Sequence, residues 1–470
     1  MASEEQASEK LRNYLRELTP EARAMLMAEL ERGALRGDGL PQAQLLLEHL
    51  RALLAEDDPA PTRAGNPIRL FFMPIEPFIV DDEPEHAHDG RLSRACVGPI
   101  WEWLAGDLVP AECKAYSADV GRFILNKEAG RAEQAARALQ DLVVLRIEEA
   151  LANAGRDDKV RRQIAYRLGT PRAQADVLAF LTLLKSRDTL AALAARLPPR
   201  IRNLSGDQLD SIVAILESVL SRQKDLFPYA LTLVMSRLPA SWQLVRIAVR
   251  AAQSDVAERV ADTPYAAAVR IVLAEIERVV RDLDSNFKRG DMERAIAQLK
   301  DVHGAIRGMR SEIALGNGSL WARQLAGIRA GVAGLFKSEL ESIPGRVRRV
   351  IRITGPGRQV TRGSIDPDEV DEIEGMLVFL AACKIYASEL ALNEITLRVL
   401  SDLQNYLENG SRSLLDVLRN AEGPERSYRL AQMEATIRFC AKLFGDEYAT
   451  QLSRAADVAA TAERKAAAKG

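Results

Sequence analysis

RAEQAARALQDLVVLRIEEALANA, residues 131–154, has the apolar spacing of an amphipathic α-helix. Similar patterns recur in PYAAAVRIVLAEIERVVRDLDSNF (264–287) and MERAIAQLKDVHGAIRGMRSEI (292–313). Between 155 and 260, shorter periodic stretches are separated by LPPR, LSGD and RLPAS, which are typical of short turns between antiparallel helices. The sequence therefore predicts an all-α protein, an antiparallel helical array or bundle with long C-terminal helices.

The composition agrees with a globular helical protein. The 470 residues are 47% hydrophobic and 28% charged, and aromatic residues make up only 5%. A net charge of −2 gives no overall attraction for nucleic acid, so electrostatic binding would need a local patch.

The cysteines and the hydropathy bear on the compartment. Cys96, Cys113, Cys383 and Cys440 form no CxxC pair, which favours reduced thiols. The start MASEEQASEK lacks the features of a secretory signal, and GMLVFLAAC (375–383) is far shorter than a membrane span. We expect a cytoplasmic protein with no transmembrane segment.

Composition shifts predict five regions along the chain. These are an N-terminal helical unit (1–56), a linker with an extended strap and acidic loop (57–90), an array of shorter helices (91–262), a long-helix bundle with a basic excursion at 343–365 (263–452), and a flexible tail (453–470). Within the bundle, the stretch from Glu369 to about Asn409 has no proline and permits a single helix of roughly forty residues.

NPIRLFFMPIEPFIVDDEPEHAH (66–88) interrupts the helical pattern. Its prolines, at 67, 74, 77 and 84, predict an extended strap or edge strand. Its bulky apolar side chains must be covered, either by the chain's own helices, which we favour, or by another protein. The candidate partner-binding residues are Phe71, Phe72, Phe78 and Ile79.

A basic stretch follows in IPGRVRRVIRITGPGRQVTRGSIDPDE (343–369). GPGR is a turn signal, and the β-branched residues beside it allow a small β-hairpin. The candidate anion-binding residues are Arg346, Arg348, Arg349, Arg352, Arg358 and Arg362, which could contact an anionic membrane or a nucleic-acid backbone. The alternative is that they pair with the acidic run at 366–374, and we favour it slightly.

Signals of catalysis are sparse. The four histidines fall in no familiar catalytic motif, so no catalytic or cofactor-binding residue and no cofactor is assigned. His86 and His88 lie among carboxylates and could bind Zn²⁺ or Mn²⁺ in a metal-dependent enzyme. A solvated loop is the favoured interpretation, because the segment has no visible frame for four ligands.

Residues 320–340 carry a heptad-like seam, formed by Trp321, Leu325, Ile328, Val332 and Leu335. Nearby glycines, Gly327, Gly331 and Gly334, would allow a second helix to approach closely, so self-association through this region is a further hypothesis.

The leading functional prediction is a non-enzymatic scaffold or adaptor that binds other proteins. The alternatives are peripheral binding to an anionic membrane or nucleic acid through 346–362, and a metal-dependent enzyme using His86 and His88.

Overall fold

The computed structural model describes residues 66–81, 89–169, 172–202, 204, 206–316, 318–352 and 365–467, with scattered positions between 14 and 50. The chain divides into two compact units, Met1–Pro239 and Ala240–Gly470. Regular structure in the described residues is helical apart from one two-stranded sheet, which confirms the all-α prediction. None of the described helices is both long enough and apolar enough to cross a membrane.

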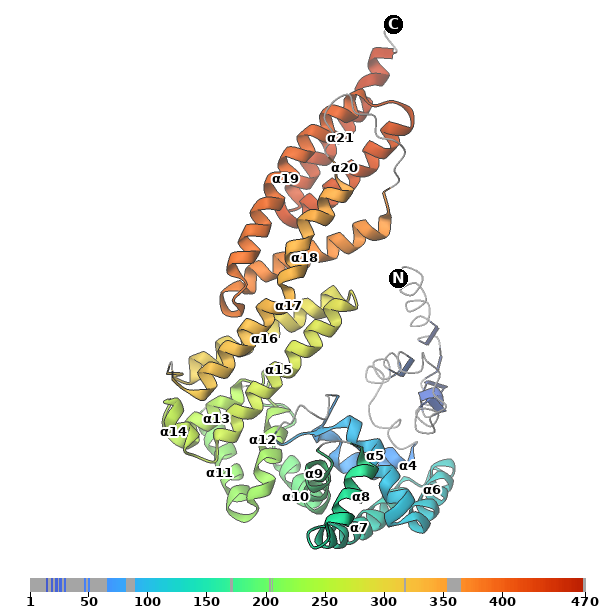
Figure 1. Cartoon of the computed structure of the whole chain (residues 1–470), viewed down its shortest axis with the longest axis vertical. Helices are drawn as coiled ribbons and strands as arrows, with labels where there is room; N and C mark the ends of the chain where they lie inside the picture. Colours follow the sequence, from blue (N-terminus) through green and yellow to red (C-terminus); the bar gives the residue numbers. More distant parts are fainter. Residues whose placement is uncertain are drawn as a thin grey trace. The chain divides into compact units, whose positions relative to one another are not determined.

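Unit 1 begins, among its continuously described residues, with a short helix and a 3-10 helix, followed by a two-stranded parallel sheet and then by helices (Figure 1). The elements are α4 (Pro67–Phe72), η2 (Met73–Phe78), β1 (Ile79–Val80), β2 (Leu92–Ser93), η3 (Arg94–Cys96), α5 (Val97–Trp103), the π-helical turn η4 (Leu104–Leu108), α6 (Pro110–Leu125), α7 (Ala129–Ala154), α8 (Asp158–Leu168), α9 (Ala173–Lys185), α10 (Arg187–Arg196), α11 (Gly206–Arg222), η5 (Lys224–Leu226) and α12 (Phe227–Met235).

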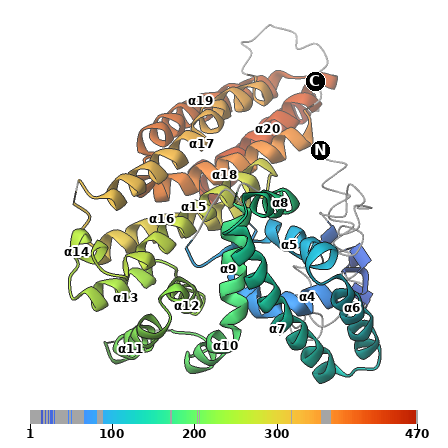
Figure 2. The ribbon, with the colours of Figure 1, turned by 60° about the horizontal axis from the view of Figure 1, so that its bottom comes forward.

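Unit 2 contains the longer helices. They are α13 (Gln243–Ala252), α14 (Ala257–Ala261), α15 (Ala266–Lys288), α16 (Met292–Glu312), α17 (Leu320–Val350), α18 (Pro367–Leu390), α19 (Asn393–Asn420), α20 (Gly423–Phe444) and α21 (Asp446–Ala467). α15 and α16 form an antiparallel hairpin, and α19, α20 and α21 pack together as consecutive helices joined by very short turns (Figures 1 and 2).

The segment predicted to be an extended strap is mostly helical, which corrects that prediction. Asn66 caps α4 by accepting a hydrogen bond from the Ile68 N–H at 2.9 Å, and Pro67 occupies the first helical position. Pro74 lies in the first turn of η2, where a missing N–H costs little, and Ile79–Val80 forms a strand. Pro67, Pro74 and Pro77 therefore lie within short helical turns.

An aromatic cluster forms part of the core of unit 1. Phe71 packs edge-on against Phe72 and Trp101, with ring centroids 5.0 and 5.3 Å apart, and Phe180 of α9 lies 5.5 Å from Phe72. All four side chains are buried. Such edge-to-face contacts stabilise by about 1 kcal/mol each beyond the burial of area.

Residues 343–350, predicted as the start of the basic excursion, belong to α17 in the structure. α17 continues through Pro344 to Val350, so Arg346, Arg348 and Arg349 lie on a helix. Ile343, Pro344, Val347 and Val350 are buried and extend the apolar stripe of α17, so packing outweighs the proline's missing hydrogen bond. The GPGR turn of the predicted β-hairpin falls outside the described residues.

Two further differences concern the C-terminal helices. The predicted helix from Glu369 to Asn409 is broken between α18 and α19 at Ala391, which has a left-handed φ of 56°. Leu390 and Leu392, on either side of the break, are fully buried, so packing of both side chains accompanies the turn. The predicted tail from 453 is helical as far as Ala467, because Leu452, Ala456 and Ala459 form a buried stripe on α21.

The division into units falls at 239/240, whereas the sequence suggested a change of character at 262/263. α13 packs against α15 and α16, and so it belongs with the long helices.

Within the predicted N-terminal unit, Leu15, Met27, Leu47 and Leu50 form a buried apolar cluster.

Candidate functional site

The α4–η2 segment has an inner face in the core and an outer face on the surface. The inner face carries three of the candidate partner-binding residues, Phe71, Phe72 and Phe78, and the fourth, Ile79, follows in β1. All four are less than 9% exposed. Phe78 packs edge-on against Tyr229 of α12 at 5.6 Å. These side chains are thus covered by the chain's own helices, in agreement with the favoured intramolecular alternative.

Three side chains from elsewhere in unit 1 hold the backbone of this segment. Tyr116 Oη donates to the Pro67 carbonyl at 2.7 Å, and Gln140 Nε2 donates to the Phe71 carbonyl at 2.8 Å. Arg91 Nη1 donates to the Pro77 carbonyl at 3.1 Å. These three bonds fix the backbone of the segment to other elements of unit 1, so the segment is a tethered platform.

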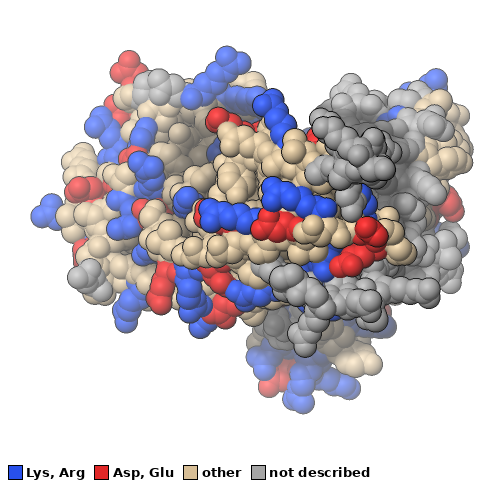
Figure 3. Space-filling view, turned by 90° about the horizontal axis from the view of Figure 1, so that it is seen from above, with Lys and Arg blue, Asp and Glu red and all other residues tan. Residues whose placement is uncertain are grey.

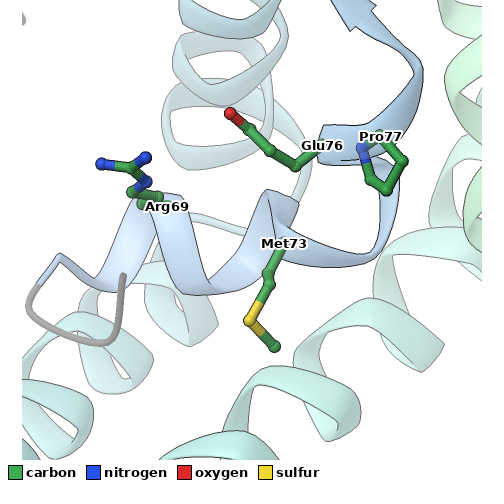
Figure 4. A pocket seen from close by; sticks show the side chains of 4 residues that line it. All are labelled: Arg69, Met73, Glu76 and Pro77. Atoms are coloured by element: carbon green, nitrogen blue, oxygen red, sulfur yellow. The ribbon is translucent and has the colours of Figure 1, made fainter. Parts of the chain in front are cut away.

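The outer face lines an open pocket of about 230 Å³, formed by Arg69, Met73, Glu76 and Pro77 (Figure 4). Arg69 and Glu76 extend to one side of the segment and Met73 extends to another, so charged and apolar groups contribute different parts of the lining. Met73 is 40% exposed although it is apolar. An exposed thioether on a fixed backbone is typical of adaptable protein-binding surfaces.

The electrostatics beside the pocket are set by an arginine between two carboxylates. Arg94 contacts Glu76 Oε1 at 3.3 Å and also pairs with Asp81. Burial alone would lower the pKa of Arg94, but the two carboxylates raise it, so the guanidinium stays charged. Glu76 thus forms an ion pair with Arg94 at the edge of the pocket.

The basic segment is largely neutralised where the structure describes it. Arg346 pairs with Glu372, and Arg349 lies 3.9 Å from Glu369, so two of the arginines pair with the acidic run at 366–374.

Arg348 pairs with Asp402 of α19 at 2.6 and 2.8 Å, and its guanidinium lies 5.3 Å from the Tyr406 ring centroid. Arg352 is exposed, whereas Arg358 and Arg362 lie outside the described residues. On the face drawn in Figure 3, basic and acidic side chains are interspersed among the coloured residues. The arginines on α17 thus take part in ion pairs, and anion binding by the basic segment stays a prediction.

His86 and His88 also lie outside the described residues, so the metal-binding prediction stays a prediction. Within the described ranges, no group of three or more His, Cys, Asp or Glu side chains is placed to hold a metal ion.

The four cysteines are free and buried. The Cys96 thiol lies 3.1 Å from Asp176 Oδ2, and burial together with this carboxylate raises the pKa of the thiol to about 12. A thiol held in its protonated form is a poor nucleophile, so Cys96 acts as a hydrogen-bond donor that connects η3 to α9.

The heptad-like seam is used within unit 2. Trp321, Leu325, Ile328 and Val332 are buried, and α17 packs against α15, α18 and α19. A Cβ on any of the nearby glycines, Gly327, Gly331 and Gly334, would meet nothing within 4 Å, so the described chain places no helix against them. Self-association through 320–340 stays a prediction.

Searches against protein-family models, curated proteins and solved structures found no match to this chain. Function is therefore inferred from its residues and their geometry.

Sequence reasoning missed the pocket because it took the segment for an extended chain. The signal was present in the spacing: Arg69, Met73 and Glu76 are separated by four and three residues, which brings residues of a helical segment close together. The large apolar side chains between them are buried.

Proposed function

We propose that the protein is a non-enzymatic cytoplasmic scaffold or adaptor, and that the pocket on the α4–η2 segment is a point where another protein docks. The observation that carries the proposal is the exposed Met73 side chain in a pocket whose backbone is tethered by Tyr116, Gln140 and Arg91. A platform that is already ordered loses little conformational entropy when a partner binds.

Unit 2 supports the scaffold role through its rigid frame. Ion pairs join α17 to α18 and to α19, through Arg346–Glu372 and Arg348–Asp402. A further set joins α18 to α20, where Arg438 contacts both Asp371 and Glu374. Charged groups shared between helices fix the geometry of the bundle, which suits a protein that holds partners in place.

Affinity capture from the native host, followed by mass spectrometry, tests the proposal. The native chain is compared with Met73→Asp, which places a charge in the pocket, and with Leu125→Asp as the matched control. Leu125 is 85% exposed in the same unit and lies outside the pocket lining. Both variants should keep the melting temperature of the native chain, because neither side chain is buried.

A partner that is captured by the native chain and by Leu125→Asp, but lost with Met73→Asp, is the expected result. Capture that is equal for all three proteins would remove the pocket from the proposal. Failure to enrich any protein with the native chain would contradict the scaffold function itself.

A further inference from the structure

The α4–η2 pocket is an open depression of about 230 Å³. Its lining combines a thioether, a pyrrolidine ring, a guanidinium and a carboxylate, from Met73, Pro77, Arg69 and Glu76. This combination is selective among the side chains that could enter, because three of the four groups interact favourably with aromatic rings.

The apolar part of the lining suits a ring. The Met73 sulfur is polarizable and makes favourable contacts with aromatic groups at about 5 Å. Pro77, which is also exposed, offers a flat apolar surface beside it. An aliphatic side chain would gain area burial here as well, so this part alone does not decide the occupant.

The charged part of the lining decides which side chain fits, through charge complementarity. The planar guanidinium of Arg69 can stack on the negative face of an aromatic ring, and stacking uses its face and not its in-plane N–H groups. Glu76 Oε1 contacts Arg94, and Oε2 accepts no hydrogen bond from the described residues. A ring with an N–H or O–H at its edge would donate to that oxygen.

Other occupants meet only part of this set. An aliphatic side chain contacts Met73 and Pro77 but gives Glu76 no donor. A lysine or arginine side chain would satisfy Glu76 but would approach the Arg69 guanidinium. An acidic side chain would face Glu76 itself.

We propose that the pocket binds a tryptophan or tyrosine side chain presented by the partner protein. This inference rests on the proposed docking function and names the chemistry of the docked group. Tryptophan and tyrosine are also the residues that most often anchor protein interfaces, since they combine a large apolar area with a polar edge.

The test uses the full chain carrying ¹³C-methyl methionine and titrates it with N-acetyl-L-tryptophanamide. The Met73 methyl signal is identified by its absence in Met73→Leu, and the other methionine methyls serve as internal controls. We expect an upfield, saturable ring-current shift of this signal with a Kd of about 1 mM, as befits a single side chain.

N-acetyl-L-leucinamide should bind about tenfold more weakly, and Arg69→Gln should weaken binding of the tryptophan analogue several-fold. Equal affinity for the two amides, or a Met73 signal that does not move, would overturn the aromatic assignment.

The two proposals fail separately. Loss of a captured partner in Met73→Asp without binding of the tryptophan analogue would leave the docking function and remove the aromatic occupant. If the tryptophan analogue binds but Met73→Asp still captures the partner, the partner does not dock at this pocket. The aromatic side chain would then not be the anchor of the partner.

Discussion

The indole of Trp242 packs directly on the backbone of Gly308 in α16. A Cβ on Gly308 would lie 2.2 Å from Cδ2 and 2.4 Å from Cε2 of the ring, distances that no real side chain occupies. The ring also contacts the Arg246 guanidinium, which lies 5.9 Å from the ring centroid. Arg246 in turn pairs with Glu312 of α16. Glycine at 308 is therefore what allows this approach of α16 and the start of α13.

Gly308→Ala should lower the free energy of unfolding by about 1–3 kcal/mol, because the ring or the helix must shift to admit the methyl group. This loss should appear although alanine has the higher helix propensity, by about 1 kcal/mol. Urea unfolding measures it. In a Trp242→Ala background the sign should reverse, and a loss that persists there would contradict the steric explanation.

Gly90→Ala should be more harmful than Gly169→Ala. Both glycines have left-handed φ angles, 73° and 65°, so both substitutions incur a conformational cost of about 1 kcal/mol. A Cβ on Gly90 would also lie 2.4 Å from the Pro228 carbonyl oxygen, whereas nothing lies within 4 Å at Gly169. We expect Gly90→Ala to cost about 2–4 kcal/mol in total by thermal or urea unfolding, and equal costs at the two positions would show that the contact with Pro228 is not limiting.

Glu374→Gln should destabilise unit 2 at neutral pH by about 1–2 kcal/mol. Glu374 accepts from Lys442 at 2.9 Å and from Arg438 Nε at 2.8 Å. Burial opposes ionisation, but these two cations lower the pKa of Glu374 below its ordinary 4.5. The stabilisation is therefore present above pH 4.5 and is lost as the pH falls through the lowered value.

The control for this measurement is Asp416→Asn, which breaks an exposed pair with Arg419 and should change stability by less than about 0.5 kcal/mol. Unfolding curves at pH 7 and pH 3.5 should show the difference between native and Glu374→Gln shrinking at the lower pH. If the difference in unfolding free energy between the native chain and Glu374→Gln did not change with pH, the effect of the substitution would come from packing and not from charge.

The buried thiols should make the protein less stable in alkali. Burial raises the pKa of Cys383 and of Cys440 to about 12, against an ordinary 9.0. Above pH 9 the unfolded chain loses these protons while the folded chain keeps them, so the free energy of unfolding falls as the pH rises, by about 1 kcal/mol per thiol at pH 10. Comparing the native chain with Cys383→Ala at pH 8 and pH 10 isolates one thiol, and an unchanged pH dependence in the variant would contradict the burial argument.

The arginines of α17 show how much of the candidate sites could be predicted. The acidic run at 366–374 lies just downstream of these arginines, and this proximity in sequence predicts its pairing with Arg346 and Arg349. The bond from Arg348 to Asp402 was not, because it joins helices that only the packing of the bundle brings together. The pocket was missed for a related reason: whether Met73 faces the core or solvent depends on which side of a short helix the other helices cover.

The helical class follows from the amino-acid sequence, because the apolar periodicity of stretches such as 131–154 is a local property that any burial of the stripe satisfies. The need to cover Phe71, Phe72 and Phe78 follows from it as well. The positions of Pro74 and Pro344 within helices, the turn at Ala391, and the exposed face of α4–η2 depend instead on how the helices pack. Those outcomes depend on contacts between residues distant in sequence, whose packing energy exceeds the local preference of a proline or a long periodic stretch.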